Sequence, residues 1–225
     1  MIALLDHGCL RFTDLLSEPA NTAIETRERR RSYQDGQLIL AEGDSDQRLL
    51  IIHSGSVKVG RVSADGCESI FSIFGPGQSI GLIAMIEGRD HKVNATAVGK
   101  TVIGHIDKSD VFSLMDLHPE IINAALSVTV SRLAEALDFI ENKRKLPLEV
   151  FTAVTLLKNL KDSNESYVIR WNQSNLALVV GVSRVSIGKV LKNLERKGLI
   201  HQKYGSIEVR DPTALAAWID DAKAK

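Results

Sequence analysis

The sequence predicts an α+β fold in which an antiparallel β domain, a long helix and a small C-terminal domain follow one another along the chain. Three observations predict it. Short apolar runs separated by turn residues fill positions 29–107, a pattern typical of a jelly-roll-like sandwich, barrel or roll of antiparallel strands. A 4-3-4-3 apolar repeat then runs from Leu126 to Ile140. Finally, residues 173–192 have the pattern of two short helices joined by a tight turn.

Composition narrows the class of protein. The chain has 225 residues, of which 44% are hydrophobic, and its 28 basic residues balance its 28 acidic ones, so it is long enough for two modest domains. Cys9 and Cys67 are too few for a disulfide framework, a structural zinc site or a four-cysteine iron–sulfur cluster. No leader peptide and no apolar run of membrane-spanning length is evident, so we expect a cytoplasmic protein without a membrane partner.

The expected strands of the β domain lie in the runs QLILA, RLLIIHSG, SVKVGRV, SIFSIF and TVIGHI. Turn residues between and around them occur at Asp35-Gly36, Glu42-Gly43-Asp44, Ser54-Gly55, Asp65-Gly66 and Gly75-Pro76-Gly77. This regular spacing indicates tight connections between neighbouring antiparallel strands.

Helices are expected from Ser109 onward. Ser109 can cap a short helix that ends at Leu117, and Pro119 suits the first turn of a second, longer helix. Leu146-Pro147 ends that helix. The predicted domains are therefore a β domain over residues 1–118, a long helix over 119–145 and a C-terminal domain over 146–225.

The long helix carries two apolar stripes. The repeat has the a/d spacing of a coiled coil and consists of Leu126, Val130, Leu133, Leu137 and Ile140. A second stripe consists of Ile121, Ala125, Val128 and Phe139. One stripe can pack on the β domain while the other meets an identical helix, which predicts a two-fold homodimer. The alternative is a single amphipathic helix that packs within its own chain.

Residues 173–192 match the helix-turn-helix template. The positions where the two helices must pack are apolar, namely Leu176, Val180, Val182, Ile187 and Val190. Ala177 is small where the helices cross, and Gly181 suits a turn that needs a positive φ. Asn172 and Ser183 can cap the two helices. An ordinary helical hairpin with a basic face is the alternative.

The second of these helices is predicted to enter the major groove of DNA. A hairpin with a turn at Tyr204-Gly205-Ser206 follows and forms a wing, and residues 171–210 contain seven Lys or Arg against two acids. Arginine and lysine can donate to guanine, and a valine can contact a thymine methyl group. The candidate DNA-binding residues are Gln173, Ser183, Arg184, Val185, Ser186, Lys189, Lys192 and Lys203.

In its order of parts the chain resembles the Crp/Fnr family of bacterial transcription regulators. The resemblance rests on DGQLILAEGDSD, LLIIHSGSVKV, the Asp65-Gly66 hairpin, FGPGQSIG and VGVSRVSIGKVLKNLERKGLI, and it covers nearly the whole chain. It implies a homodimer on a pseudo-palindromic DNA operator, with an effector in the β domain acting through the long helix. It also implies contact with RNA polymerase if the protein is an activator.

The effector pocket departs from the family's cyclic-AMP pattern. Leu82 stands where that pattern has a ribose-binding glutamate, and His91-Lys92 replace the arginine and hydroxyl residue that hold the phosphate. Ala136 and Leu137 lack the hydroxyls that contact the base. We therefore expect no orthodox cyclic-AMP response. Arg89, His91 and Lys92 either bind another anion or form a solvated loop. The candidate pocket residues are Gly81, Leu82, Ile83, Arg89, His91, Lys92, Leu133, Ala136 and Leu137.

Other cofactors and activities are not expected. The oxygen sensors of this family use four cysteines, and the six histidines here show no haem- or metal-ligand spacing. The chain shows no nucleophile, base and orienter set and no phosphate loop, so we expect no enzyme.

The usual Arg-Glu start of the family's recognition helix is Arg184-Val185 here, which predicts a different DNA half-site. The competing hypothesis is a nucleotide- or small-anion-binding signalling module whose C-terminal domain contacts protein.

Overall fold

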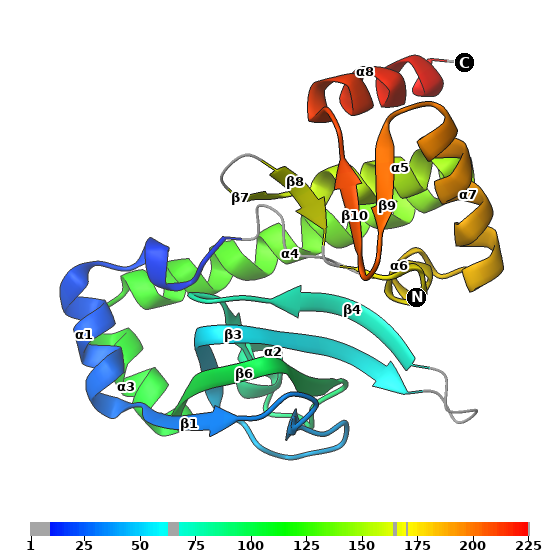
Figure 1. Cartoon of the computed structure of the whole chain (residues 1–225). Helices are drawn as coiled ribbons and strands as arrows, with labels where there is room; N and C mark the ends of the chain where they lie inside the picture. Colours follow the sequence, from blue (N-terminus) through cyan, green and yellow to red (C-terminus); the bar gives the residue numbers. More distant parts are fainter. Residues whose placement is uncertain (1–9, 63–67, 164–165, 170, 225) are drawn as a thin grey trace. The chain divides into compact units, whose positions relative to one another are not determined.

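A computed structural model describes residues 10–62, 68–163, 166–169 and 171–224. Both cysteines and the predicted Asp65-Gly66 turn lie outside these residues. The described chain forms two compact units, one that ends at Glu135 and one that begins at Ala136 (Figure 1). The α+β architecture agrees with the prediction, with strands concentrated in the first unit and a helical domain with a small sheet in the second.

The first unit is built on a six-stranded sheet in which every pairing is antiparallel. Its main path runs β1-β6-β3-β4, while β2 pairs with β6 and β5 pairs with β3. The strands are β1 (Arg29–Tyr33), β2 (Leu38–Leu40), β3 (Leu49–Val62), β4 (Glu68–Phe74), β5 (Ser79–Ile80) and β6 (Asn94–Ile106). The long strands β3 and β6 pair along most of their length and form the spine of the roll.

Strand β3 is buried on both faces where it begins, because its side chains alternate between two apolar clusters. Leu50 and Ile52 belong to a cluster with Tyr33, Phe74 and other strand residues. Leu49 and Ile51 belong to a second cluster with side chains of the helices of this unit. An unbroken run of four apolar residues is what a strand covered on both faces requires.

The predicted turn at Ser54-Gly55 is wrong, because β3 continues through it as one strand. The pairing register between β3 and β6 shifts on either side of Ser54, so the glycine marks an irregularity in the ladder. Gly55 has a φ of +79°, and a Cβ there would lie 2.4 Å from Thr101 Oγ1. Positive φ and lack of space both explain a glycine here without a chain reversal.

The short helices of this unit contribute buried side chains to the apolar cluster that contains Leu49 and Ile51. A 3₁₀ turn (Thr13–Leu15) precedes α1 (Glu18–Arg27), α2 (Leu82–Glu87) lies between β5 and β6, and α3 (Lys108–Leu117) follows β6. The predicted cap at Ser109 is wrong, because the N-cap residue of α3 is Asp107. Strand β6 ends at Ile106, so the chain turns into the helix at once and leaves Ser109 inside its first turn.

The long helix α4 (Glu120–Lys145) begins one residue after Pro119 and ends before Leu146-Pro147, close to the predicted bounds. Of the second stripe, Ile121, Ala125 and Val128 are buried in the cluster that contains Leu49. Phe139 instead contacts Phe151 edge-on in the second unit, with ring centroids 5.1 Å apart.

In the second unit, helices and a four-stranded sheet of order β7-β8-β10-β9 pack around one apolar cluster. Its helices are α5 (Leu148–Lys158), α6 (Gln173–Val180), α7 (Arg184–Arg196) and α8 (Pro212–Lys223). Its strands are β7 (Lys161–Ser163), β8 (Ser166–Ile169), β9 (Ile200–Lys203) and β10 (Ser206–Val209). Strand β7 pairs antiparallel with β8 at the edge of this sheet.

Candidate nucleic-acid interface and effector site

Helices α6 and α7 form a helix-turn-helix with a bend of 106° between them. Gly181 ends α6 with a φ of 72°, as the turn requires. Asn172 caps α6 by accepting from the N–H of Asn175, and Ser183 caps α7 by accepting from the N–H of Ser186. These predicted caps and the predicted glycine turn are confirmed.

The inner faces of the two helices are buried as their apolar pattern predicts. Leu176, Val180 and Ile187 are fully buried, and Ala177 is 5% exposed in the same cluster. This packing fixes which face of α7 remains in solvent.

The outward side of α7 carries the predicted DNA-reading residues. Val185 is 70% exposed. Arg184, Lys189 and Lys192 are exposed too, and none of the three forms an ion pair with the described residues. These cations are therefore available to phosphate or base edges. Ser186 is less accessible, and its hydroxyl lies 2.9 Å from that of Ser183.

A hollow of about 480 Å³ separates the wing from the starts of both helices. Its lining contains three predicted residues, one from each element: Gln173, Arg184 and Lys203. The other lining residues were not among the predicted DNA-binding residues: Trp171, Asn172, Ser174, Gln202, Tyr204, Gly205, Ser206 and Ile207. Of these, the sequence predicted Asn172 only as a helix cap and Tyr204-Gly205-Ser206 only as the turn of the wing. The signal for most of them was the hairpin that follows α7. The hollow shows that helix and wing share one concave surface.

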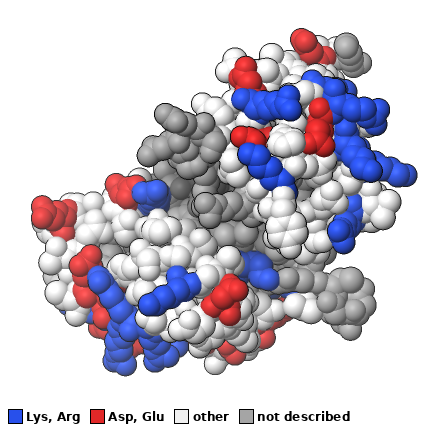
Figure 2. Space-filling view, viewed as in Figure 1, with Lys and Arg blue, Asp and Glu red and all other residues white. Residues whose placement is uncertain are grey.

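Positive charge gathers on the α7 side of this unit (Figure 2). The wing adds Lys203, whose Nζ lies 2.7 Å from Glu208 Oε2 across the hairpin. This hydrogen bond holds the pKa of Glu208 below its usual value. Because Lys203 is exposed and Glu208 is only half-buried, a phosphate can replace Glu208 as the partner of Lys203 at little cost.

In the first unit, the predicted effector residues cluster around α2. Gly81 caps this helix with a φ of 93°, and a Cβ there would lie 2.3 Å from the Arg48 carbonyl oxygen. Leu82 is 2% exposed and lies in the apolar cluster with Leu49, whereas Ile83 is 60% exposed. Leu133 lies on α4 in the same unit, whereas Ala136 and Leu137 lie on the part of α4 that belongs to the second unit.

The three basic residues predicted beside α2 differ in exposure. His91 is buried, and its Nε2 is hydrogen-bonded to the backbone carbonyl of Asp46. Arg89 and Lys92 are exposed, and Lys92 lies 3.7 Å from Glu87 in an ion pair. The imidazole of His91 is therefore committed to the protein itself.

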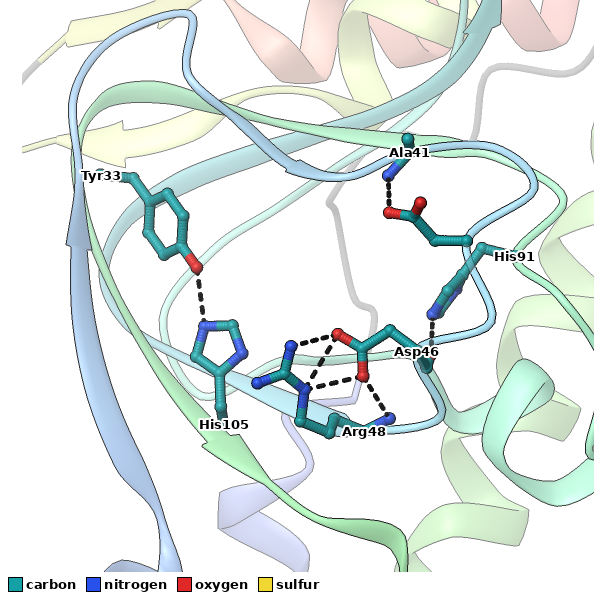
Figure 3. A network of polar contacts seen from close by, with 7 residues as sticks. Tyr33, Ala41, Asp46, Arg48, His91 and His105 are labelled. Carbon is teal, nitrogen blue, oxygen red and sulfur yellow. Dashed lines mark hydrogen bonds and ion pairs between the residues drawn. The ribbon is translucent and has the colours of Figure 1, made fainter.

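His91 belongs to a polar network inside the roll (Figure 3). Arg48 donates to the Asp46 carboxylate from Nε and Nη2, and these hydrogen bonds lower the pKa of Asp46. Nearby, the Tyr33 hydroxyl and His105 Nε2 lie 2.9 Å apart in a buried hydrogen bond. Burial, followed by the charges of Arg48 and Arg31, lowers the pKa of His105 to about 4. His105 is thus neutral at pH 7.

We expect this unit to lose stability between pH 6.5 and pH 4. The folded pKa of His105 is below its unfolded value, so the unfolded state binds more protons in this window and stability falls as the pH falls. The loss is about 1–3 kcal/mol for one group. Urea unfolding followed by circular dichroism measures it.

His105→Asn removes the titrating group and serves as the comparison. Its unfolding free energy should change less over the same pH range than that of the wild type. Equal slopes for the two proteins would contradict the assignment to His105.

Comparison with known proteins matches both units. Residues 30–118 match the family model of the cyclic nucleotide-binding domain, and residues 152–218 match that of the Crp-like helix-turn-helix domain. The chain belongs to the Crp/Fnr family. It is therefore a DNA-binding transcription regulator of the Crp/Fnr type, and the resemblance found in the sequence is confirmed.

Two curated relatives in this Crp/Fnr family match almost the whole of this chain. The cyclic AMP receptor protein of Thermus thermophilus is 28% identical over 215 residues, which cover 92% of this chain and 95% of the relative. A CRP-like cAMP-activated global transcriptional regulator of Mycobacterium tuberculosis is 27% identical over 206 residues, covering 88% and 92%.

Solved structures show the same fold. A Crp/Fnr-family transcriptional regulator from Thermus thermophilus aligns with a TM-score of 0.73 and 23% identity, over 86% of this chain and 100% of that one. The c-di-GMP responsive global regulator CLP of Xanthomonas campestris aligns with a TM-score of 0.75 and 22% identity, over 87% and 100%.

The described residues show neither a membrane-spanning helix nor a metal-binding cluster. None of their helices is, alone, long and apolar enough to cross a membrane. Nor do these residues contain a group of three or more His, Cys, Asp or Glu side chains that could hold a metal ion.

Proposed function

We propose that this Crp/Fnr regulator is a homodimer that reads a pseudo-palindromic DNA operator without responding to cyclic AMP in the usual way. The observation that carries the DNA part is the exposed, uncommitted face of α7 beside the wing hollow. The apolar side chains on the dimer stripe of α4 are all exposed in the single chain, with Leu126, Leu133 and Leu137 near 60%. An identical stripe on a second copy is the partner that would bury them.

Burial of Leu82 and the hydrogen bond of His91 support the proposal about cyclic AMP. The family resemblance puts Leu82 in the place of the glutamate that accepts from the ribose, and leucine cannot accept a hydrogen bond. An unpaired ribose hydroxyl costs about 1–3 kcal/mol, or about 5- to 150-fold in affinity. His91 cannot provide the bidentate contact of an arginine to the phosphate while it is bound to Asp46.

The effectors in the names of the relatives argue both for and against a cyclic-AMP response. Two are named as cyclic-AMP proteins, while one structural neighbour is named for its response to c-di-GMP. The family therefore contains more than one effector chemistry, so membership alone does not assign cyclic AMP to this chain. Contact with RNA polymerase belongs to the proposal only if the regulator is an activator, and the proposal gives the chain no catalytic role.

Selection of binding sites from a randomised duplex pool tests both parts. Purified protein is used at fixed salt, with and without cyclic AMP, because phosphate contacts make affinity depend on salt. We expect the same two-fold motif in both arms. Enrichment only with cyclic AMP would overturn the proposal about the β domain, and no enrichment in either arm would overturn sequence-specific binding.

A further inference from the structure

A chain of hydrogen bonds joins α7, the wing and α6. The Glu195 carboxylate, near the end of α7, accepts from the backbone N–H of Gln202 at 2.8 Å and from its side-chain Nε2 at 2.9 Å. The same carboxylate lies 3.1 Å from His201 Nδ1. Gln202 Oε1 in turn accepts from Gln173 Nε2 at 3.0 Å. One carboxylate thus connects the end of α7 to two consecutive residues of β9.

This network borders the surface that faces DNA in the proposed function. Gln173 is the first residue of α6, and its Oε1 lies 3.5 Å from the place of a Cβ on Gly188, in the middle of α7. Gln173 and Gln202 also line the hollow beside Arg184 and Lys203. The side chains that connect the three elements therefore lie next to those that reach DNA.

We infer that Glu195 is a positioning residue for DNA recognition, an inference that rests on the proposed function. Through Gln202, it holds the wing tip at a fixed distance from the recognition helix. Lys203 and the fully exposed Tyr204 at that tip then meet the same duplex that Arg184 reads. A hydrogen bond to a charged group is about twice as strong as a neutral one, so a carboxylate fixes the wing better than an amide.

Glu195 is charged under the conditions of DNA binding. The backbone N–H of Gln202 holds the pKa of Glu195 below its ordinary value. Because Glu195 is negatively charged, the effect of removing it on DNA affinity distinguishes positioning from simple charge repulsion. A carboxylate near DNA repels phosphates, so charge alone predicts that removing it strengthens binding. Loss of wing positioning predicts the opposite result.

The test measures the affinity of wild type, Glu195→Ala and Glu195→Gln for the selected operator by fluorescence anisotropy over a salt series. We expect Glu195→Ala to bind about tenfold more weakly and its log–log salt slope to fall by about one, because the phosphate contact of Lys203 is lost. Glu195→Gln keeps an acceptor for the Gln202 N–H and should be intermediate. Asp220→Ala removes the same charge from the exposed side of α8 and should not weaken binding.

A second variant keeps the test decisive if Glu195→Ala does not fold. Gln202→Ala leaves the backbone hydrogen bond to Glu195 but cuts the connection to Gln173, and it should also weaken binding. Unchanged or tighter binding by folded Glu195→Ala, or by Gln202→Ala in its place, would overturn the inference. Wild-type protein that binds no duplex above its nonspecific level would instead overturn the proposed function.

Discussion

Leu133→Lys is expected to make the protein monomeric at concentrations where the wild type is a dimer. Leu133 is 60% exposed and lies at the centre of the 4-3-4-3 stripe, between Val130 and Leu137. In the proposed dimer, the substitution removes two buried leucines and brings two ammonium groups together at the two-fold axis. The lost burial alone is worth about 3–6 kcal/mol for the two copies, or a roughly 10²- to 10⁴-fold weaker dimer.

Sedimentation velocity over a concentration series measures the change. Ala134→Lys is the matched control, because it adds the same charge at the next, exposed residue of α4, outside the stripe. This control should remain dimeric. A dimer of wild-type strength in Leu133→Lys would show that the copies associate through another surface, and a wild type that stays monomeric would remove the proposed dimer altogether.

The helix-turn-helix was predictable because its determinants are local. Two caps, one glycine and a few apolar positions fall within about twenty consecutive residues, and each has a direct physical requirement. The structure places Asn172, Gly181 and Ser183 in the predicted roles. The end of α4 before Pro147 was predictable for the same reason.

Three helices, α1, α2 and α8, were not predicted from the sequence. Helix α1 buries only Ala20 and Ile24, so its sequence shows little apolar periodicity. Helix α2 has six residues, and an apolar run of this length does not distinguish helix from strand. Helix α8 did have a readable signal, because Asp211 accepts from the N–H groups of Thr213 and Ala214 and Pro212 stands in the first turn.

The site residues likewise divide into those with local sequence determinants and those that only the fold brings together. The exposed residues of α7 follow from the packing of one helix, so the sequence identified them. The hollow needs α6, α7 and the wing together, and its Glu195–Gln202–Gln173 hydrogen bonds connect side chains that no periodic pattern relates. Likewise, the sequence flagged His91 as a possible ligand residue. Only the fold shows that its side chain is bonded to Asp46, in a loop some 45 residues away.

Arg184→Ala should weaken binding to the selected operator by about 1–3 kcal/mol and relax the base preference at one position of each half-site. Arg184 is the first residue of α7, is exposed, and lines the hollow, so it lies at the end of the recognition helix that reaches base edges. A bidentate contact from arginine to guanine is the commonest specific contact in a major groove. Repeating the site selection with the variant measures both effects.

Arg196→Ala separates base reading from charge. Arg196 is exposed at the opposite end of the same helix, where its guanidinium bonds to Asn193, so its loss removes the same charge without touching the first turn. We expect Arg196→Ala to leave the selected motif unchanged and to lower affinity equally for all sequences, if at all. If Arg184→Ala kept both the wild-type affinity and the wild-type motif, the first turn of α7 would not be the part of this regulator that reads DNA. Val185 stands where family members commonly carry a glutamate, whose carboxylate accepts from a cytosine amino group. The motif selected by the wild type should therefore show no preference for cytosine at that position.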